Sequence, residues 1–299
     1  MIQTPVQKIC VCGAGTMGRG IAQLAAQSGF DTILYDVQRS VLEEAKVSIQ
    51  QNLRLLEDKG KLKAGENEAV LMRLQFTDNF RDCKADLIIE AIIEKPEMKI
   101  NLFNQLAGLN SVETIFATNT SSLSVSQISA GVQHREKVVG MHFFNPAPVM
   151  KLVEIVKGEY TSGQTIEIIF STVKQLNKIP VMCKDAPGFI VNRIARPYYI
   201  ESLRLVEEGY VDFLTIDALM ESTGFKMGPF KLMDLIGNDI NFSVSCSVYL
   251  QLGKPKRLKP SPIQEEKVKQ GELGKKSGKG YYIYNSPGAN PPNSPKGGE

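Results

Sequence analysis

The sequence predicts an α/β fold, with a doubly wound, mainly parallel sheet that carries a helical-hairpin insertion, followed by an all-helical domain. Short apolar runs alternate with helix-compatible segments up to residue 184, as they do in chains of βαβ units. Beyond that point the alternation stops, and apolar residues recur with helical spacing. We therefore expect a sheet domain over residues 1–184 and a helical domain over residues 185–285.

The first strand–helix–strand unit contains a glycine-rich turn. An apolar run over residues 8–12 leads into GAGTMG at residues 13–18, and a helix-compatible stretch follows as far as Gly29. The next apolar run ends at Asp36. A G-x-G-x-x-G pattern between a strand and a helix, with an acidic residue at the end of the following strand, is typical of a dinucleotide-binding, Rossmann-like domain.

The residues of this turn each have a physical role in holding a dinucleotide. Gly13 permits the tight turn, Gly15 lets the backbone approach a pyrophosphate, and Gly18 allows close packing of helix on strand. Asp36 would accept hydrogen bonds from the adenosine ribose and repel a 2′-phosphate, so NAD is the expected cofactor. The turn residues expected to bind it are Gly13, Gly15, Thr16, Met17 and Gly18.

The interval after Asp36 is too long for a single crossover helix. Almost forty residues separate it from the next expected strand, near residues 75–77. An amphipathic helix is expected first, then a turn at Gly60 and a second helix over residues 66–74. Such a hairpin could overhang the carboxyl edge of the sheet and provide walls for a ligand longer than a small acid.

A histidine and a glutamate are expected to face each other across two later strands. If residues 138–144 and 151–156 pair as a hairpin, His142 lies opposite Glu154. Hydride transfer from an alcohol needs a base for the hydroxyl proton, and a carboxylate beside an imidazole can fix its tautomer. The alternative is an ordinary buried histidine, whereas the other histidine, His134, is expected on the surface.

Polar residues also follow neighbouring strands of the expected sheet. Glu94 comes after the strand at residues 85–92, and Ser121 comes directly after the strand at residues 114–120. Turn and capping chemistry could explain each of them alone. Beside a dinucleotide fingerprint, however, their common position at strand ends predicts a cleft.

The composition disfavours several classes of protein. A formal net charge of only +3 does not favour nucleic acid or a membrane surface as a partner. No apolar run approaches the ~20 residues of a membrane span. The first residues lack the pattern of a secretory signal, so we expect a cytoplasmic protein. Residues 286–299 lack apolar content and are expected to be a disordered tail.

The cysteines and histidines give no sequence signal for a metal. The five cysteines form no C-x-x-C pair, although Cys10 and Cys12 share one face of the first expected strand. With only two histidines in the chain, a zinc site is not expected. We expect packed free thiols that do not cluster, and no metal ion.

Several segments match a known family, in family order, between residues 8 and 284. The most specific are HFFNPAPVMKLVE and DAPGFIVNR, and the others include GAGTMGRGIA, ATNTSSL and GKKSGKGYY. By these segments the chain resembles the 3-hydroxyacyl-CoA dehydrogenases, most closely the stand-alone bacterial 3-hydroxybutyryl-CoA dehydrogenases.

The resemblance implies an oxidoreductase that interconverts (S)-3-hydroxyacyl-CoA and 3-oxoacyl-CoA by hydride transfer with NAD(H). It implies that His142 is the base, paired with Glu154, and that Ser121 and Asn192 contact the oxygens of the substrate. It also implies a homodimer formed through the helical domain.

The resemblance further implies where the two large ligands bind. The helical hairpin would help to hold coenzyme A, with Lys59 and Asn52 near it, and relatives carry serine where Asn52 aligns. The implied NAD contacts are Asp36, Glu94, Lys99, Ser121, Asn145 and Lys276.

Two other functions stay open at this point. The β-hydroxyacid dehydrogenases and imine reductases also join a Rossmann domain to a helical domain, but they usually act without a His–Glu pair. A crystallin-like or NAD-sensing relative would keep the fold without catalysis.

Overall fold

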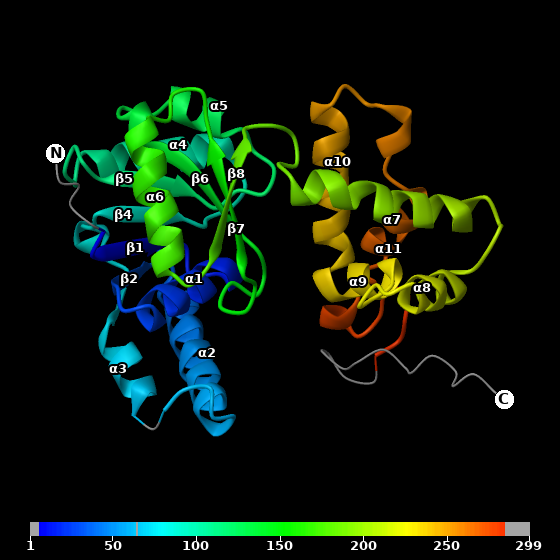
Figure 1. The fold of residues 1–299 in the computed structure, drawn as a ribbon, viewed down its shortest axis with the longest axis horizontal. Helices are drawn as coiled ribbons and strands as arrows, with labels where there is room; N and C mark the ends of the chain where they lie inside the picture. The colour runs from blue at the N-terminus through cyan, green and yellow to red at the C-terminus, as the bar shows by residue number, and fades with distance from the viewer. Residues whose placement is uncertain (1–5, 64, 285–299) are drawn as a thin grey trace. The chain divides into compact units, whose positions relative to one another are not determined.

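The computed structural model describes residues 6–63 and 65–284. The described residues form two compact units, divided between Ala186 and Pro187, which are considered separately below (Figure 1). Asp185 belongs to the first unit, and its carboxylate accepts hydrogen bonds from the Ser124 hydroxyl and the Ser126 N–H, both at 2.7 Å. The tail expected over residues 286–299 lies outside the described residues.

The first unit is built on one eight-stranded sheet with the order β3-β2-β1-β4-β5-β6-β7-β8. Only β6 and β7 pair antiparallel, and all other neighbours are parallel. The strand order reverses between β1 and β4, which makes this the switch point where open α/β sheets bind ligands. The strands are β1 (Lys8–Cys12), β2 (Asp31–Tyr35), β3 (Leu74–Thr77), β4 (Leu87–Glu90), β5 (Ile115–Thr118), β6 (Val138–Phe143), β7 (Leu152–Lys157) and β8 (Ile179–Lys184).

Helices connect these strands and pack on the sheet through apolar side chains. Ile9 and Val11 of β1, for example, join a buried core that also contains Ile21 from the helix that follows them. The helices of this unit are α1 (Thr16–Gln27), α2 (Arg39–Asp58), α3 (Glu66–Met72), α4 (Pro96–Ala107), α5 (Val125–Ala130) and α6 (Gly163–Gln175), with short 3₁₀ turns η1 (Phe80–Asp82) and η2 (Arg135–Lys137). The predicted doubly wound fold is confirmed.

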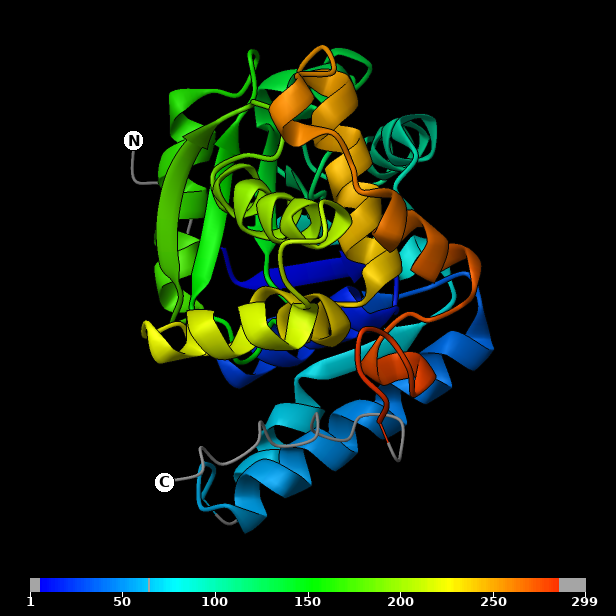
Figure 2. The same cartoon turned by 90° about the vertical axis from the view of Figure 1, so that its right-hand side faces the viewer.

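The predicted helical hairpin is also confirmed, as the pair α2 and α3. Both views show these helices side by side and projecting away from the sheet (Figures 1 and 2). Leu42, Ile49 and Leu53 lie on the buried face of α2. The second helix is shorter than predicted: it ends at Met72, and β3 begins at Leu74, because the chain here pairs with β2.

The second unit contains helices and only isolated β-bridges in its described part. Its core is aromatic, with Phe230, Tyr281 and Tyr282 buried together. The helices are α7 (Val191–Glu207), α8 (Phe213–Ser222), α9 (Pro229–Ile236), α10 (Asn238–Gln251) and α11 (Pro262–Lys269), with 3₁₀ turns η3 (Lys256–Leu258) and η4 (Lys275–Ser277). The expected all-helical domain is confirmed. No helix in the ranges 6–63 and 65–284 is long and apolar enough to cross a bilayer.

The buried carboxylate of Asp234 on α9 holds residues 281–284, the last described segment of the chain, through hydrogen bonds. It accepts hydrogen bonds from the N–H groups of Tyr281 and Tyr282 and from the Tyr284 hydroxyl, all at 3.0 Å. Burial raises the pKa of this carboxyl, and the donated hydrogen bonds oppose the rise.

We expect Asp234→Ala to destabilise the second unit strongly. Each buried donor left without a partner lowers the unfolding free energy by about 1–3 kcal/mol. This change leaves several donors without a partner. The unfolding free energy from urea titration should fall by more than about 2 kcal/mol. Asp212→Ala is the matched control, because that carboxylate is exposed and only caps α8, so its loss should cost much less. Equal losses in the two variants would contradict this account.

Candidate functional site

The glycine-rich turn between β1 and α1 requires glycine at two of its positions. Gly13 has a φ of +102°, and a Cβ there would lie 2.6 Å from the carbonyl oxygen of Ala91. A Cβ at Gly18 would collide with the carbonyl of Gly13. Gly15 is the N-cap of α1, and a Cβ on it would meet no atom of the described chain within 4 Å. The turn is thus tight on its protein side and open above the helix N-terminus, where Thr16 and Met17 begin the helix.

Asp36 lies directly against this turn. Its Oδ2 accepts a hydrogen bond from the N–H of Ala14 at 2.8 Å, and its Oδ1 accepts one from Gln38 at 2.9 Å. The side chain follows β2, at the carboxyl end of the sheet beside the switch point. The glycines and the acidic residue therefore come together as the sequence pattern predicts.

His142 and Glu154 form a buried pair across β6 and β7. They are direct partners in the antiparallel register, as predicted, and His142 Nδ1 lies 2.7 Å from Glu154 Oε2. Glu154 is fully buried and His142 is 5% exposed. The imidazole also packs against the Phe144 ring, with 4.5 Å between centroids. A carboxylate at Nδ1 leaves Nε2 as the ring atom suited to exchange a proton with a ligand.

Glu94 links the segments that follow β4 and β5. Its carboxylate accepts hydrogen bonds from the hydroxyl of Thr120 and, at 3.2 Å, from the N–H of Ser121. Ser121 is thereby held at the end of β5. These two predicted site residues are in direct contact.

Lys99 is buried, with 1% exposure, and pairs with two carboxylates. Its ammonium lies 2.6 Å from Glu90 Oε1 and 3.1 Å from Glu94 Oε2. Glu90 also accepts a hydrogen bond from the Thr118 hydroxyl at 2.7 Å. Burial raises the pKa of the Glu90 carboxyl, and the charge of Lys99 opposes the rise. The prediction from sequence missed Glu90, although a charged residue at the end of an apolar strand was the available signal.

Two asparagines of the sheet unit lie just after the ends of strands β5 and β6. Asn145 is exposed and follows β6. Asn119 Oδ1 accepts a hydrogen bond from the Phe143 N–H at 2.9 Å, so it ties the segment after β5 to the end of β6.

The expected coenzyme A residues lie on the helical hairpin. Asn52 and Lys59 are exposed, and Lys59 is the C-cap of α2. Asn52 Nδ2 lies 3.4 Å from Gln23 Oε1 of α1.

Two other predicted site residues belong to the helical unit. Asn192 is half-buried in the first turn of α7. Lys276 lies in η4, and its ammonium is 2.6 Å from Asp239 Oδ1.

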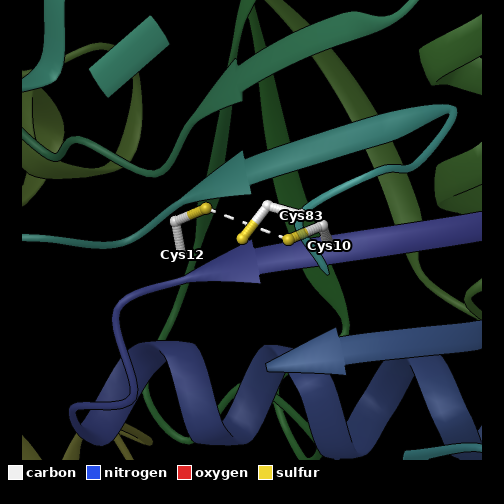
Figure 3. Close-up of side chains that lie close together, drawn as sticks. All are labelled: Cys10, Cys12 and Cys83. Atoms are coloured by element: carbon white, nitrogen blue, oxygen red, sulfur yellow. Dashed lines mark hydrogen bonds between the residues drawn. The ribbon is translucent and has the colours of Figure 1, made fainter. Parts of the chain in front are cut away.

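The prediction that the cysteines do not cluster is wrong. Cys83 lies beside Cys10 and Cys12 in the interior of the sheet unit, with all three sulfurs within 4.8 Å of one another (Figure 3). Spacing along the chain could not reveal this, because Cys83 is far from Cys10 and Cys12 in the sequence and only the folded sheet brings its loop next to β1.

Comparison with known proteins agrees with this arrangement over both units. Residues 8–186 match the family model "3-hydroxyacyl-CoA dehydrogenase, NAD binding domain", and residues 188–284 match "3-hydroxyacyl-CoA dehydrogenase, C-terminal domain". The sheet unit is therefore an NAD-binding domain of this family.

Curated relatives cover nearly the whole chain. The chain is 47% identical to "3-hydroxyadipyl-CoA dehydrogenase" of Escherichia coli K12 over 93% of its own length, and it spans 59% of that protein. It is 41% identical to "Probable 3-hydroxybutyryl-CoA dehydrogenase" of Deinococcus radiodurans, covering 93% of this chain and 100% of the relative.

Solved structures show the same fold. The crystal structure of (S)-3-hydroxybutyryl-CoA dehydrogenase from Ralstonia eutropha has a TM-score of 0.89 at 34% identity, covering 94% of this chain and all of that one. A structure of 3-hydroxybutyryl-CoA dehydrogenase from E. coli K12 has a TM-score of 0.90 at 44% identity, covering 95% of this chain and 60% of that one. The chain therefore belongs to the 3-hydroxyacyl-CoA dehydrogenase family.

Proposed function

We propose that the protein is an NAD-dependent dehydrogenase that interconverts (S)-3-hydroxyacyl-CoA and 3-oxoacyl-CoA. The observation that carries the proposal is the His142–Glu154 pair, 2.7 Å apart and buried, in a domain that also holds the dinucleotide turn. A base oriented by a carboxylate is what alcohol oxidation by hydride transfer requires.

The residues of the sheet unit fit NAD. The open backbone at Gly15 and the N-terminus of α1 suit a pyrophosphate, and Asp36 suits the ribose hydroxyls. When bound there, NAD would supply the hydride acceptor for the oxidation, and NADH would supply the hydride for the reduction. The further proposed contacts with the cofactor are Glu94, Lys99, Ser121, Asn145 and Lys276.

His142 moves the proton. In the oxidation, Nε2 takes the proton of the 3-hydroxyl group as hydride leaves C3, and the imidazolium that forms is stabilised by Glu154 at Nδ1. In the reduction, Nε2 returns the proton to the ketone oxygen. Ser121, held by Glu94, and Asn192 are proposed to orient the substrate's oxygens.

Coenzyme A and a second subunit are the proposed larger partners. The exposed α2 residues Asn52 and Lys59 would lie near coenzyme A. The helical unit would form a homodimer, and it exposes many large apolar side chains, namely Ile194, Leu214, Leu219, Phe225, Leu235, Ile240 and Leu250. All five cysteines are free thiols, which suits a reducing cytoplasm.

The activity is tested by NADH oxidation with acetoacetyl-CoA, followed by absorbance. The same assay is run with NADPH and with free acetoacetate as controls. We expect rapid turnover only with NADH and the coenzyme A ester. Tight NADH binding without turnover of the ester would contradict the proposal and favour a non-catalytic relative.

Asp36→Ser tests the proposed choice of NAD. We expect the KM for NADH to rise about 10- to 100-fold, because hydrogen bonds to a charged group contribute about 1.5–3 kcal/mol. The KM for NADPH should fall, since the repelling carboxylate is gone. Asp31→Ser, at the opposite end of β2, is the matched control and should change neither constant. An unchanged preference in Asp36→Ser would contradict the assignment.

A further inference from the structure

Cys10, Cys12 and Cys83 form a sealed cluster of three sulfurs that the proposed reaction does not use. Each residue is 0% exposed, and the Cys10 and Cys12 sulfurs are 3.9 Å apart. Figure 3 shows the three side chains projecting toward one another between β1 and the loop after η1. All three sulfurs lie within 4.8 Å of one another.

The backbone holds the three side chains in place. Cys10 and Cys12 share one face of β1, because side chains alternate along a strand, and β1 is paired on both sides by β2 and β4. The loop that carries Cys83 is fixed by its own hydrogen bonds. Cys83 donates its N–H to the Phe80 carbonyl at 3.1 Å, and its carbonyl accepts from Asn110 Nδ2 at 2.9 Å.

The sulfur spacing fits a metal ion better than a disulfide. Thiolate–metal bonds of about 2.3 Å in a trigonal plane separate the sulfurs by about 4.0 Å. The hydrogen-bonded Cys10 and Cys12 sulfurs are already 3.9 Å apart, and the Cys83 sulfur lies within 4.8 Å of both. A disulfide needs about 2.0 Å between sulfurs. Closing that gap within β1 would bend a strand that both neighbours hold.

The composition of the cluster selects the class of ion. Sulfur ligands favour soft ions such as copper(I) and zinc, whereas magnesium and calcium require oxygen. Structural zinc takes four ligands. Within the described residues the group contains three sulfurs and no histidine or carboxylate.

We propose that Cys10, Cys12 and Cys83 bind one copper(I) ion in a three-coordinate, all-sulfur site. Binding breaks the three S–H bonds and releases three protons to solvent, each thiolate donates an electron pair to the metal, the complex carries a net charge of −2, and copper stays copper(I). Because the sulfurs are sealed, uptake requires a transient opening of the η1 loop.

The bound ion would stabilise β1, the strand that leads into the dinucleotide turn. Cys12 directly precedes Gly13, and its carbonyl accepts a hydrogen bond from the Ala91 N–H at 2.8 Å. Metal bound at Cys12 and Cys83 would join β1 to the connection between β3 and β4. We therefore expect occupancy to raise the thermal midpoint of the sheet unit.

The test is anaerobic titration of the full chain with copper(I) in competition with a colorimetric copper(I) chelator. We expect one equivalent to be taken from the chelator by the wild type and by Cys246→Ser, whose thiol lies outside the cluster. Cys83→Ser should bind at least about 100-fold more weakly. Equal affinity in Cys83→Ser and the wild type, or no uptake by the wild type, would overturn the proposal.

A second measurement on the wild type does not depend on the folding of a variant. X-ray absorption at the copper edge should show three sulfur neighbours at about 2.3 Å. Two sulfurs, or nitrogen or oxygen neighbours, would overturn the site. Zinc uptake with exclusion of copper(I) would also overturn it, as would a peroxide-induced disulfide among these cysteines in a protein that takes up no copper.

Discussion

Replacing His142 by glutamine is expected to lower kcat about 10²- to 10⁴-fold while NADH still binds. A positioned general acid–base group contributes a factor of this size, and an amide cannot take the hydroxyl proton. Glutamine is also uncharged and of similar length, so the buried position beside Glu154 stays filled. The measurement is steady-state turnover of acetoacetyl-CoA together with NADH binding followed by fluorescence.

His134→Gln is the matched control, because His134 is the only other histidine of the chain. It is half-buried ahead of the 3₁₀ turn η2 and lies in no part of the proposed site. Its turnover should equal that of the wild type. Wild-type turnover in His142→Gln would remove His142 from the mechanism, whereas lost NADH binding would indicate a disturbed domain rather than a lost base.

Replacing Glu154 by glutamine is expected to lower kcat by about 10²- to 10⁴-fold, although Glu154 touches neither substrate nor cofactor in the proposed mechanism. Its carboxylate accepts the hydrogen bond at Nδ1 of His142, 2.7 Å away, and so sets which ring nitrogen can act as the base. An amide can donate to Nδ1 instead and stabilise the wrong tautomer. It also removes the charge that stabilises the imidazolium.

The kinetic pattern separates positioning from folding. We expect KM for acetoacetyl-CoA to stay near its wild-type value while kcat falls, because an interaction used mainly in the transition state is lost. Glu113→Gln, which removes an exposed ion pair with Lys137, should leave both constants unchanged. The double variant with His142→Gln should be hardly slower than His142→Gln alone, since the two residues act as one unit. Additive losses would show that Glu154 acts independently of His142.

The sequence alone predicted the pairing of β6 with β7 and the contact between His142 and Glu154. The turn between the two strands defines the centre of the hairpin, and this centre sets which residues lie opposite each other. Because side chains alternate between the two faces of a strand, the face of each residue follows as well. The dinucleotide turn was predictable for a similar reason. Its glycines are required by the local backbone conformation and by close contacts with nearby backbone. At Gly18, for example, a Cβ would collide with the Gly13 carbonyl.

Features that depend on distant segments were not predictable in this way. Glu90 and Lys99 share a short stretch of sequence, but their burial together depends on β5 supplying Thr118 and on the loop that carries Glu94. The end of α3 was misplaced because pairing of Leu74 with β2 ends the helix early. Propensity along the chain contains no information about that partner.

By itself the sequence determined the doubly wound sheet, the helical hairpin, the helical second unit and the identity of the His–Glu pair, since each rests on local periodicity or on a short turn. Tertiary structure alone decided that Cys83 joins Cys10 and Cys12 and that Lys99 is buried between two carboxylates. The physical reason is the same in both cases. The parallel strand order brings together residues from separate connections, and only burial within the sheet's packed interior sets their distances.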